Sequence, residues 1–110
     1  MTFDPELADR VRALVADADG LAEKAMFGGI GWTIGGNMAA GAHYDGRLMI
    51  RCSKEDFDEF LAEPGAQGMK KGTSNLTGWV LIDSDAVQDE ESLSRWVARG
   101  RAYAESLPTK

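Results

Sequence analysis

The chain has 110 residues, 44% of them apolar and 27% charged, with a formal net charge of −6. This length and balance are typical of one globular domain over residues 1–110, and they exclude a disordered or fibrous chain. The acidic charge disfavours direct nucleic-acid binding, because such affinity comes largely from Lys and Arg neutralising phosphates.

Three features of the sequence bear on where the protein resides. No apolar run approaches the roughly 18 residues of a membrane span. The N-terminal stretch MTFDPELADR lacks the basic and apolar regions of a signal peptide. The single cysteine, Cys52, has no internal disulfide partner, which favours a reducing compartment. We therefore expect a cytoplasmic protein with no membrane association.

The first predicted element is an amphipathic helix over residues 4–20. Asp4 is a suitable N-cap, and Pro5 suits the first helical position. Gly20 is expected to end the helix, as glycine commonly does. The apolar stripe at helical spacing comprises Leu7, Val11, Leu14, Val15 and Ala18.

The glycine-rich middle of the chain predicts a meander of antiparallel strands. Gly28 and Gly29 are expected to interrupt or bulge the first extended segment. Residues 35–37 form a tight-turn signal, and Asp45-Gly46 indicates a two-residue hairpin loop. The extended segments are residues 25–27, 30–34, 38–44 and 47–52.

The second half predicts two helices and one further strand. Ser53 caps a short helix that closes at Pro64-Gly65, and the polar residues 65–77 are expected to form a loop. A strand over 79–82 precedes a long helix over 89–107. Together the elements predict an α+β fold of two layers, with an antiparallel sheet of about five strands packed against helices.

The glycines do not match a phosphate-binding loop. GIGWTI at residues 29–34 lacks the third glycine of a dinucleotide fingerprint. Gly31 and Gly36 have Walker-loop spacing, but Asn37 and Met38 stand where Lys and a hydroxyl residue are needed. The residues that follow alternate like a strand, so we interpret these glycines as turn and bulge residues.

No catalytic, cofactor or metal site is predicted. A two-residue loop pairs Tyr44 with Arg47 and places His43 and Cys52 about 13 Å apart on one face. That separation exceeds the ~3 Å that a base and nucleophile need, and a one-residue slip would put them on opposite faces. The acidic run at 83–94 lacks the glycine and glutamate of a calcium loop.

The same register predicts two different sheet faces. Leu48, Ile50 and Cys52 are expected to face the core. The opposite face combines small alanines with an aromatic ring, a methionine and an arginine, which suggests a surface that another subunit covers; the alternative is a solvated sheet face. This possible interaction surface comprises Ala40, Ala42, Tyr44, Met49 and Arg51.

A ligand-binding alternative centres on Trp32. Trp32 follows the glycines and is expected either to pack in the core or to line a small cleft. In that alternative the protein is a small anion- or metabolite-binding protein or enzyme with a cleft near Trp32, Tyr44 and Arg51. Arg51 would hold an anion and Tyr44 would orient it.

Four segments carry a family resemblance: KAMFGGIG at 24–31, YDGRLMIRC at 44–52, GWVLID at 78–83 and RWVARGRAYAESLP at 95–108. These segments resemble the N-terminal domain of the TfoX/Sxy family. They keep the family's order and approximate spacing and extend over nearly all of the chain. The segment before GWV often reads Gly-Arg-Pro-Met in the family, whereas residues 72–76 here are GTSNL, so no role of that arginine is carried over.

The resemblance implies an α+β, secretion-chaperone-like architecture and a link to bacterial regulation of natural competence. Full-length members are positive regulators with a second, C-terminal domain, which a chain ending at Lys110 is expected to lack. The family supplies no catalytic residues to carry over. We therefore expect a non-enzymatic regulatory or protein-interaction module that binds a protein partner or forms a homodimer.

Overall fold

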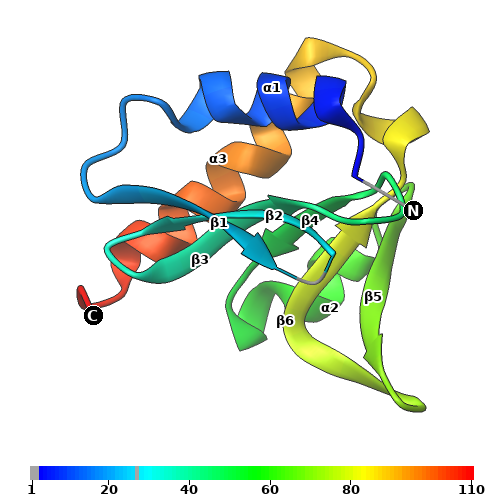
Figure 1. Ribbon diagram of the computed structural model, residues 1–110. Helices are drawn as coiled ribbons and strands as arrows, with labels where there is room; N and C mark the ends of the chain where they lie inside the picture. Colours follow the sequence, from blue (N-terminus) through cyan, green and yellow to red (C-terminus); the bar gives the residue numbers. More distant parts are fainter. Residues whose placement is uncertain (1–2, 27) are drawn as a thin grey trace.

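A computed structural model describes residues 3–26 and 28–110 (Figure 1). Within these residues one antiparallel sheet has the strand order β1-β2-β3-β4-β6-β5. The strands are β1 (Leu21–Met26), β2 (Gly29–Ile34), β3 (Asn37–Ala42), β4 (Leu48–Arg51), β5 (Ala66–Lys71) and β6 (Ser74–Ile82). The helices are α1 (Pro5–Val15), α2 (Lys54–Leu61), the short 3-10 helix η1 (Ser84–Val87) and α3 (Glu90–Ser106).

The three α-helices pack on one face of the sheet, which confirms the predicted two-layer α+β fold, with six strands instead of about five. Figure 1 shows α1 and α3 on the same side of the sheet. The Phe60 ring of α2 and the Trp96 ring of α3 make an edge-to-face contact, with centroids 5.7 Å apart. One apolar cluster therefore joins all three helices to the sheet.

The first helix begins as predicted but ends earlier. Asp4 caps it by accepting a hydrogen bond from the Glu6 amide at 3.0 Å. The helix ends at Val15, and Gly20 lies in the turn before β1 with a φ of +74°. The prediction that Gly20 ends the helix is wrong because the positive φ serves this turn, where the Gly20 carbonyl accepts from the Gly35 amide.

Two hairpins replace elements that were predicted differently. The expected bulged strand is the β1–β2 hairpin, with Gly28 in its turn at a φ of +75°; Phe27 lies outside the described residues. The expected loop over 65–77 is largely the β5–β6 hairpin, which turns at Gly72. Its Gly, Lys, Ser and Thr residues suit an exposed edge strand as well as a loop, so composition alone did not separate the two.

The turn between β3 and β4 has three residues, so the prediction of a two-residue loop is wrong. The His43 amide donates to the Arg47 carbonyl at 2.9 Å, and the Gly46 amide donates to the His43 carbonyl at 3.0 Å. Gly46 takes a φ of +95°, as expected when a tight turn is followed by a glycine bulge. The Asp45 carboxylate holds the loop by accepting from the Arg47 amide at 3.1 Å.

This extra loop residue moves the register by one position. Ala42 pairs with Leu48 and Ala40 with Ile50, and all four are buried beneath the helices. The sequence had placed Ala40 and Ala42 on the face opposite Leu48 and Ile50. That assignment is wrong because a one-residue slip turns every side chain of a strand to the other face.

Helix α3 crosses the sheet at a β-bulge in β3. Trp32 pairs with Ala40 and Thr33 with Met38, which leaves Ala39 without a partner on β2. A Cβ atom on Gly100 of α3 would collide with the Ala39 carbonyl oxygen. Only glycine at position 100 therefore lets the helix backbone approach the bulge this closely.

Replacing Gly100 by alanine is expected to lower the free energy of unfolding by about 1–3 kcal/mol, the usual cost of overpacking. Alanine is the better helix former by about 1 kcal/mol, so propensity alone predicts the opposite sign. Urea unfolding followed by circular dichroism measures the change. As a control, Ala98→Gly at an exposed position of α3 should cost only about 0.5–1 kcal/mol. A Gly100→Ala protein as stable as the unchanged chain would contradict the contact.

Asp45→Asn is expected to destabilise the protein at neutral pH by about 1.5–3 kcal/mol, the range of hydrogen bonds to charged groups. Partial burial raises the pKa of Asp45, but hydrogen bonds from Arg47 and the contact with His43 outweigh it and lower the pKa well below its usual value. The charged carboxylate thus contributes stability above its unfolded pKa of about 3.9, and this contribution is lost as the pH falls below that value.

Urea unfolding at a series of pH values checks this dependence. The difference in stability between the unchanged chain and Asp45→Asn should shrink as the pH falls below about 4. A difference that stays constant down to acid pH would show that the Asp45 charge does not hold the loop.

Candidate interaction surface

The sheet face opposite the helices carries a second apolar cluster, all of whose members come from strands. Four of the five methionines in the chain belong to it. We call Met26, Met38, Met49 and Met69 the methionine face. Among the described residues, no helix contributes to this cluster.

Two paired glycines explain why methionines gather here. Gly31 on β2 and Gly41 on β3 are cross-strand partners, and neither has a side chain to fill this face. Side-chain atoms of Met26 and Met38 occupy the space where a Cβ of Gly31 would lie, and those of Met49 do so at Gly41. The flexible thioethers therefore lie against bare backbone. Met49 is only 2% exposed, whereas Met26 and Met38 are half-buried.

A groove of about 730 Å³ lies beside the methionine face, between the β3–β4 loop and the β5–β6 hairpin. Tyr44 stands at this groove; it is 44% exposed and is the single large hydrophobic residue classed as exposed in the described part of the chain. Its ring lies 4.5 Å from the His43 ring, centroid to centroid. The lining residues are His43, Tyr44, Arg47, Gln67, Gly68, Met69, Lys70, Asn75 and Leu81.

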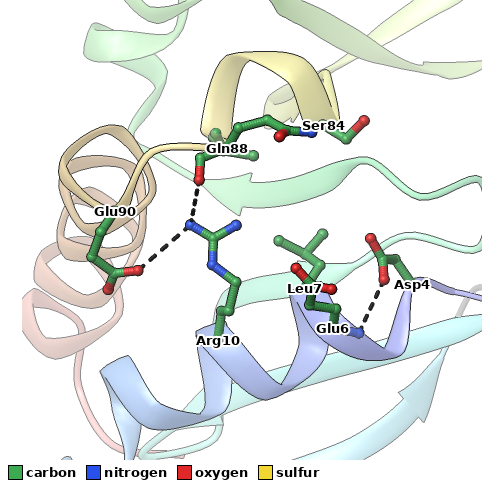
Figure 2. Close-up of a pocket in the computed structure, with 8 residues that line it drawn as sticks. Asp4, Glu6, Leu7, Arg10, Ser84, Gln88 and Glu90 are labelled. Carbon is green, nitrogen blue, oxygen red and sulfur yellow. Dashed lines mark hydrogen bonds and ion pairs between the residues drawn. The ribbon is translucent and has the colours of Figure 1, made fainter.

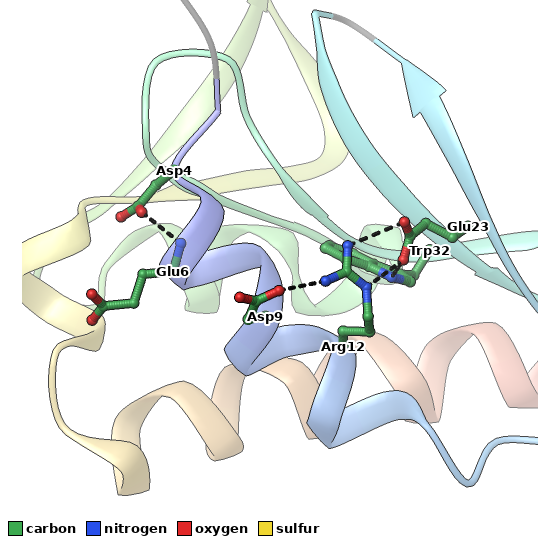
Figure 3. A network of polar contacts seen from close by, with 6 residues as sticks. All are labelled: Asp4, Glu6, Asp9, Arg12, Glu23 and Trp32. Carbon is green, nitrogen blue, oxygen red and sulfur yellow. Dashed lines mark hydrogen bonds and ion pairs between the residues drawn. The ribbon is translucent and has the colours of Figure 1, made fainter.

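Charge is unevenly divided between the two layers. Of the 18 acidic residues, only Glu23 lies in a strand, and it points to the helices. Figure 3 shows its carboxylate bound to Arg12 of α1 and to the indole of Trp32, with Nε–Oε1 and Nε1–Oε1 distances of 2.8 Å. The hydrogen bonds from Arg12 lower the pKa of Glu23. The strands also contribute Lys24 and Lys70, so the methionine face has cations but no strand carboxylate.

The five residues predicted as one surface fall into four places. Ala40 and Ala42 are in the core, Met49 is in the methionine face, and Tyr44 is at the groove. Arg51 lies at the other end of β4, where its Nη1 donates to the Gly78 carbonyl at 2.9 Å. Its guanidinium is 4.7 Å from the ring centroid of Trp79 and 5.2 Å from that of Tyr103.

The alternative cleft near Trp32, Tyr44 and Arg51 does not form. Trp32 is 0% exposed and is covered on the helix side of the sheet. Tyr44 lies in the loop that precedes β4, whereas Arg51 is the last residue of that strand, so the length of β4 separates the two side chains. The arrangement of the alternative ligand-binding site is therefore wrong in its geometry.

A second pocket, of about 320 Å³, joins α1 to η1 and α3 (Figure 2). Arg10 crosses it, donating to the Gln88 carbonyl at 3.1 Å and pairing with Glu90 at 3.5 Å. Asp4 is occupied as the helix cap. Because Arg10 binds groups on the neighbouring elements and Asp4 binds the backbone of its own helix, we interpret these contacts as structural.

The structure separates His43 from Cys52, as expected for a one-residue slip. His43 faces the groove, with its Nδ1 2.8 Å from Oδ1 of Asp45, whereas Cys52 belongs to the main core. Burial raises the pKa of the Cys52 thiol to about 11. Among residues 3–26 and 28–110, no three His, Cys, Asp or Glu side chains gather as metal ligands would. No helix in this part of the chain is long and apolar enough to cross a bilayer.

Sequence reasoning missed most of the methionine face and the groove. It placed Met38, Met49 and Tyr44 on the face opposite the core, but it did not assign Met26, Met69 or Lys70 to a surface. The available signal was the placement of Met26, Met38 and Met49 in or beside three predicted strands, at positions near glycines. Met69 and Lys70 were hidden because their segment had been predicted as a loop.

The Cys52 thiol is expected to react with a disulfide reagent at about pH 8 at least tenfold more slowly in the folded protein than after urea unfolding. Its burial and raised pKa keep it protonated and inaccessible, whereas a free cysteine has a pKa of about 8.5. Absorbance of the released thiolate follows the reaction. A Cys52→Ser, Ala98→Cys double variant, with an exposed thiol, is the control. Equal rates for the two folded proteins would contradict the burial.

Comparison with known proteins gives one match. A family model described as the TfoX N-terminal domain matches residues 13–104. No curated protein and no solved structure matches the chain. The matched span contains every strand, α2 and most of α3, but only the last three residues of α1. The protein therefore belongs to the TfoX N-terminal domain family.

Proposed function

We propose that this protein is a non-enzymatic regulatory module that acts by binding another protein, or a second copy of itself, through the methionine face. The observation that carries the proposal is that α1, α2 and α3 all pack on one side of the sheet, whereas the apolar cluster on the other side consists of strand residues alone.

The composition of the methionine face supports a binding role. Methionine has three rotatable bonds and a polarisable sulfur, so it adapts to the shape of a partner and is common at binding surfaces. Met26 and Met38 are half-buried and flank Gly31, which provides room for side-chain movement. A partner would cover apolar atoms that the chain's own helices leave uncovered.

The state of the ionisable groups supports the non-enzymatic part of the proposal. Arg10, Arg12 and Arg47 are each bound to carboxylates or carbonyls of the chain itself. The Cys52 thiol is buried and protonated. We further propose that the module resides in the cytoplasm. We also propose that it takes part in the regulation of natural competence, as the family resemblance implies.

The proposal is tested with a photo-reactive amino acid placed at position 38, on the methionine face, or at position 98, on the exposed side of α3. Illumination in the native host followed by mass spectrometry identifies the cross-linked chains, and light scattering measures self-association. We expect products from position 38 that are absent from position 98 and that are lost when Met26→Glu is added. The same products from both positions, or none from position 38, would refute the proposed surface.

A further inference from the structure

The groove beside the methionine face has an apolar floor and a polar rim. Met69 and Leu81 are almost fully buried at its base, and the exposed Tyr44 ring stands beside them. The volume of about 730 Å³ lies within the roughly 300–1,000 Å³ typical of ligand pockets. A few apolar side chains of a partner would therefore fit against this floor.

The rim offers groups that bind carboxylates. Lys70 and Asn75 are exposed, and within the described residues their side chains have no hydrogen-bond or ion-pair partner. Arg47 is already held, since its Nη1 donates to Gln67 Oε1 at 2.7 Å and its Nη2 pairs with Asp45. The free cation at the groove is thus Lys70, among the residues that the structure describes.

The nearby carboxylates do not cancel the attraction between Lys70 and an acidic partner. Asp45 is engaged by both Arg47 and His43, and Asp83 accepts a hydrogen bond from Gln67 Nε2 at 2.7 Å. The strands that form the groove contain no acidic residue. An acidic partner therefore meets a free lysine here, whereas the helical side of the molecule would repel it.

We propose that the groove binds an acidic protein segment with apolar anchor side chains. This inference rests on the proposed function and names the class of partner. The apolar anchors would cover Met69 and Leu81 and stack on Tyr44, while carboxylates would pair with Lys70 and accept from the Asn75 amide. Lys24, at the far side of the methionine face, extends the same preference along the sheet.

Two other occupants fit less well. A nucleic acid needs several cations to neutralise its phosphates, and it gains little from a methionine floor. A second copy of this chain is acidic on its helices, but their apolar sides are buried in its own core. Tyr44 is the one large hydrophobic residue classed as exposed in the described part of the chain, so a second copy offers no acidic segment with exposed anchors.

Two synthetic peptides test the proposal. Both carry the same Leu and Phe anchors, with Glu at every other position in one and Lys in the other, and fluorescence anisotropy measures their binding to the full chain. We expect the Glu peptide to bind and the Lys peptide to bind at least about tenfold more weakly. Added salt should weaken the binding of the Glu peptide, because screening reduces the attraction between exposed charges.

Charge-reversal variants locate the binding. Lys70→Glu should lower the affinity for the Glu peptide by about three- to tenfold, consistent with the modest strength of exposed charge pairs. The matched control Lys54→Glu changes the same charge on α2, on the helical side, and should leave the affinity unchanged. Tyr44→Ala should lower the affinity for the Glu peptide and for the Lys peptide by the same factor, since it removes an apolar contact that the two peptides share.

Each contrary outcome has its own meaning. Tighter binding of the Lys peptide, or an equal effect of Lys70→Glu and Lys54→Glu, overturns the acidic partner class but leaves the proposed function intact. A single-stranded oligonucleotide that displaces the Glu peptide also overturns it, in favour of a nucleic acid. If neither peptide binds while cross-links still form at position 38, the inference fails alone; if those are absent too, the proposed function fails with it.

Discussion

The close contact between Gly100 of α3 and the bulged Ala39 of β3 organises the rest of the molecule. A helix backbone can meet a sheet backbone only where no side chain intervenes, and here the glycine lies against the unpaired residue of the bulge. This approach sets α3 across β3 and β4, where Trp96 and Val97 complete the core. Helix α1 then packs beside α3 on the same face of the sheet.

Covering one face with all the helices determines the character of the other. Its glycines leave space that no helix fills, and methionine side chains lie across them. Because helices and connections hold all but one of the acidic residues, the uncovered face is apolar and weakly basic in an acidic protein. Recognition therefore has both an apolar and an electrostatic basis on this face, and the adjacent groove, with Tyr44 and Lys70 at its rim, combines the two.

One additional residue in the β3–β4 loop accounts for the difference between the predicted interaction surface and the observed one. Asp45-Gly46 is a strong signal for a two-residue hairpin, but Asp45 accepts from the Arg47 amide and the loop includes Tyr44. Local sequence cannot distinguish these turns, because both use an aspartate followed by a glycine with positive φ. The choice depends on burying Ala40 and Ala42 beneath the helices, which is a property of the whole core.

The sequence alone determined where the α-helices begin, the N-caps of the first two, the α+β class and the family, because N-capping residues, helical periodicity and recurring motifs are local. Asp4 and Ser53 cap their helices as predicted, and α3 spans almost the predicted residues. Tertiary structure decided the strand register, the β5–β6 hairpin and the groove. Those features depend on pairing between distant segments, where a shift of one residue changes which face meets the core, and no short segment carries that information.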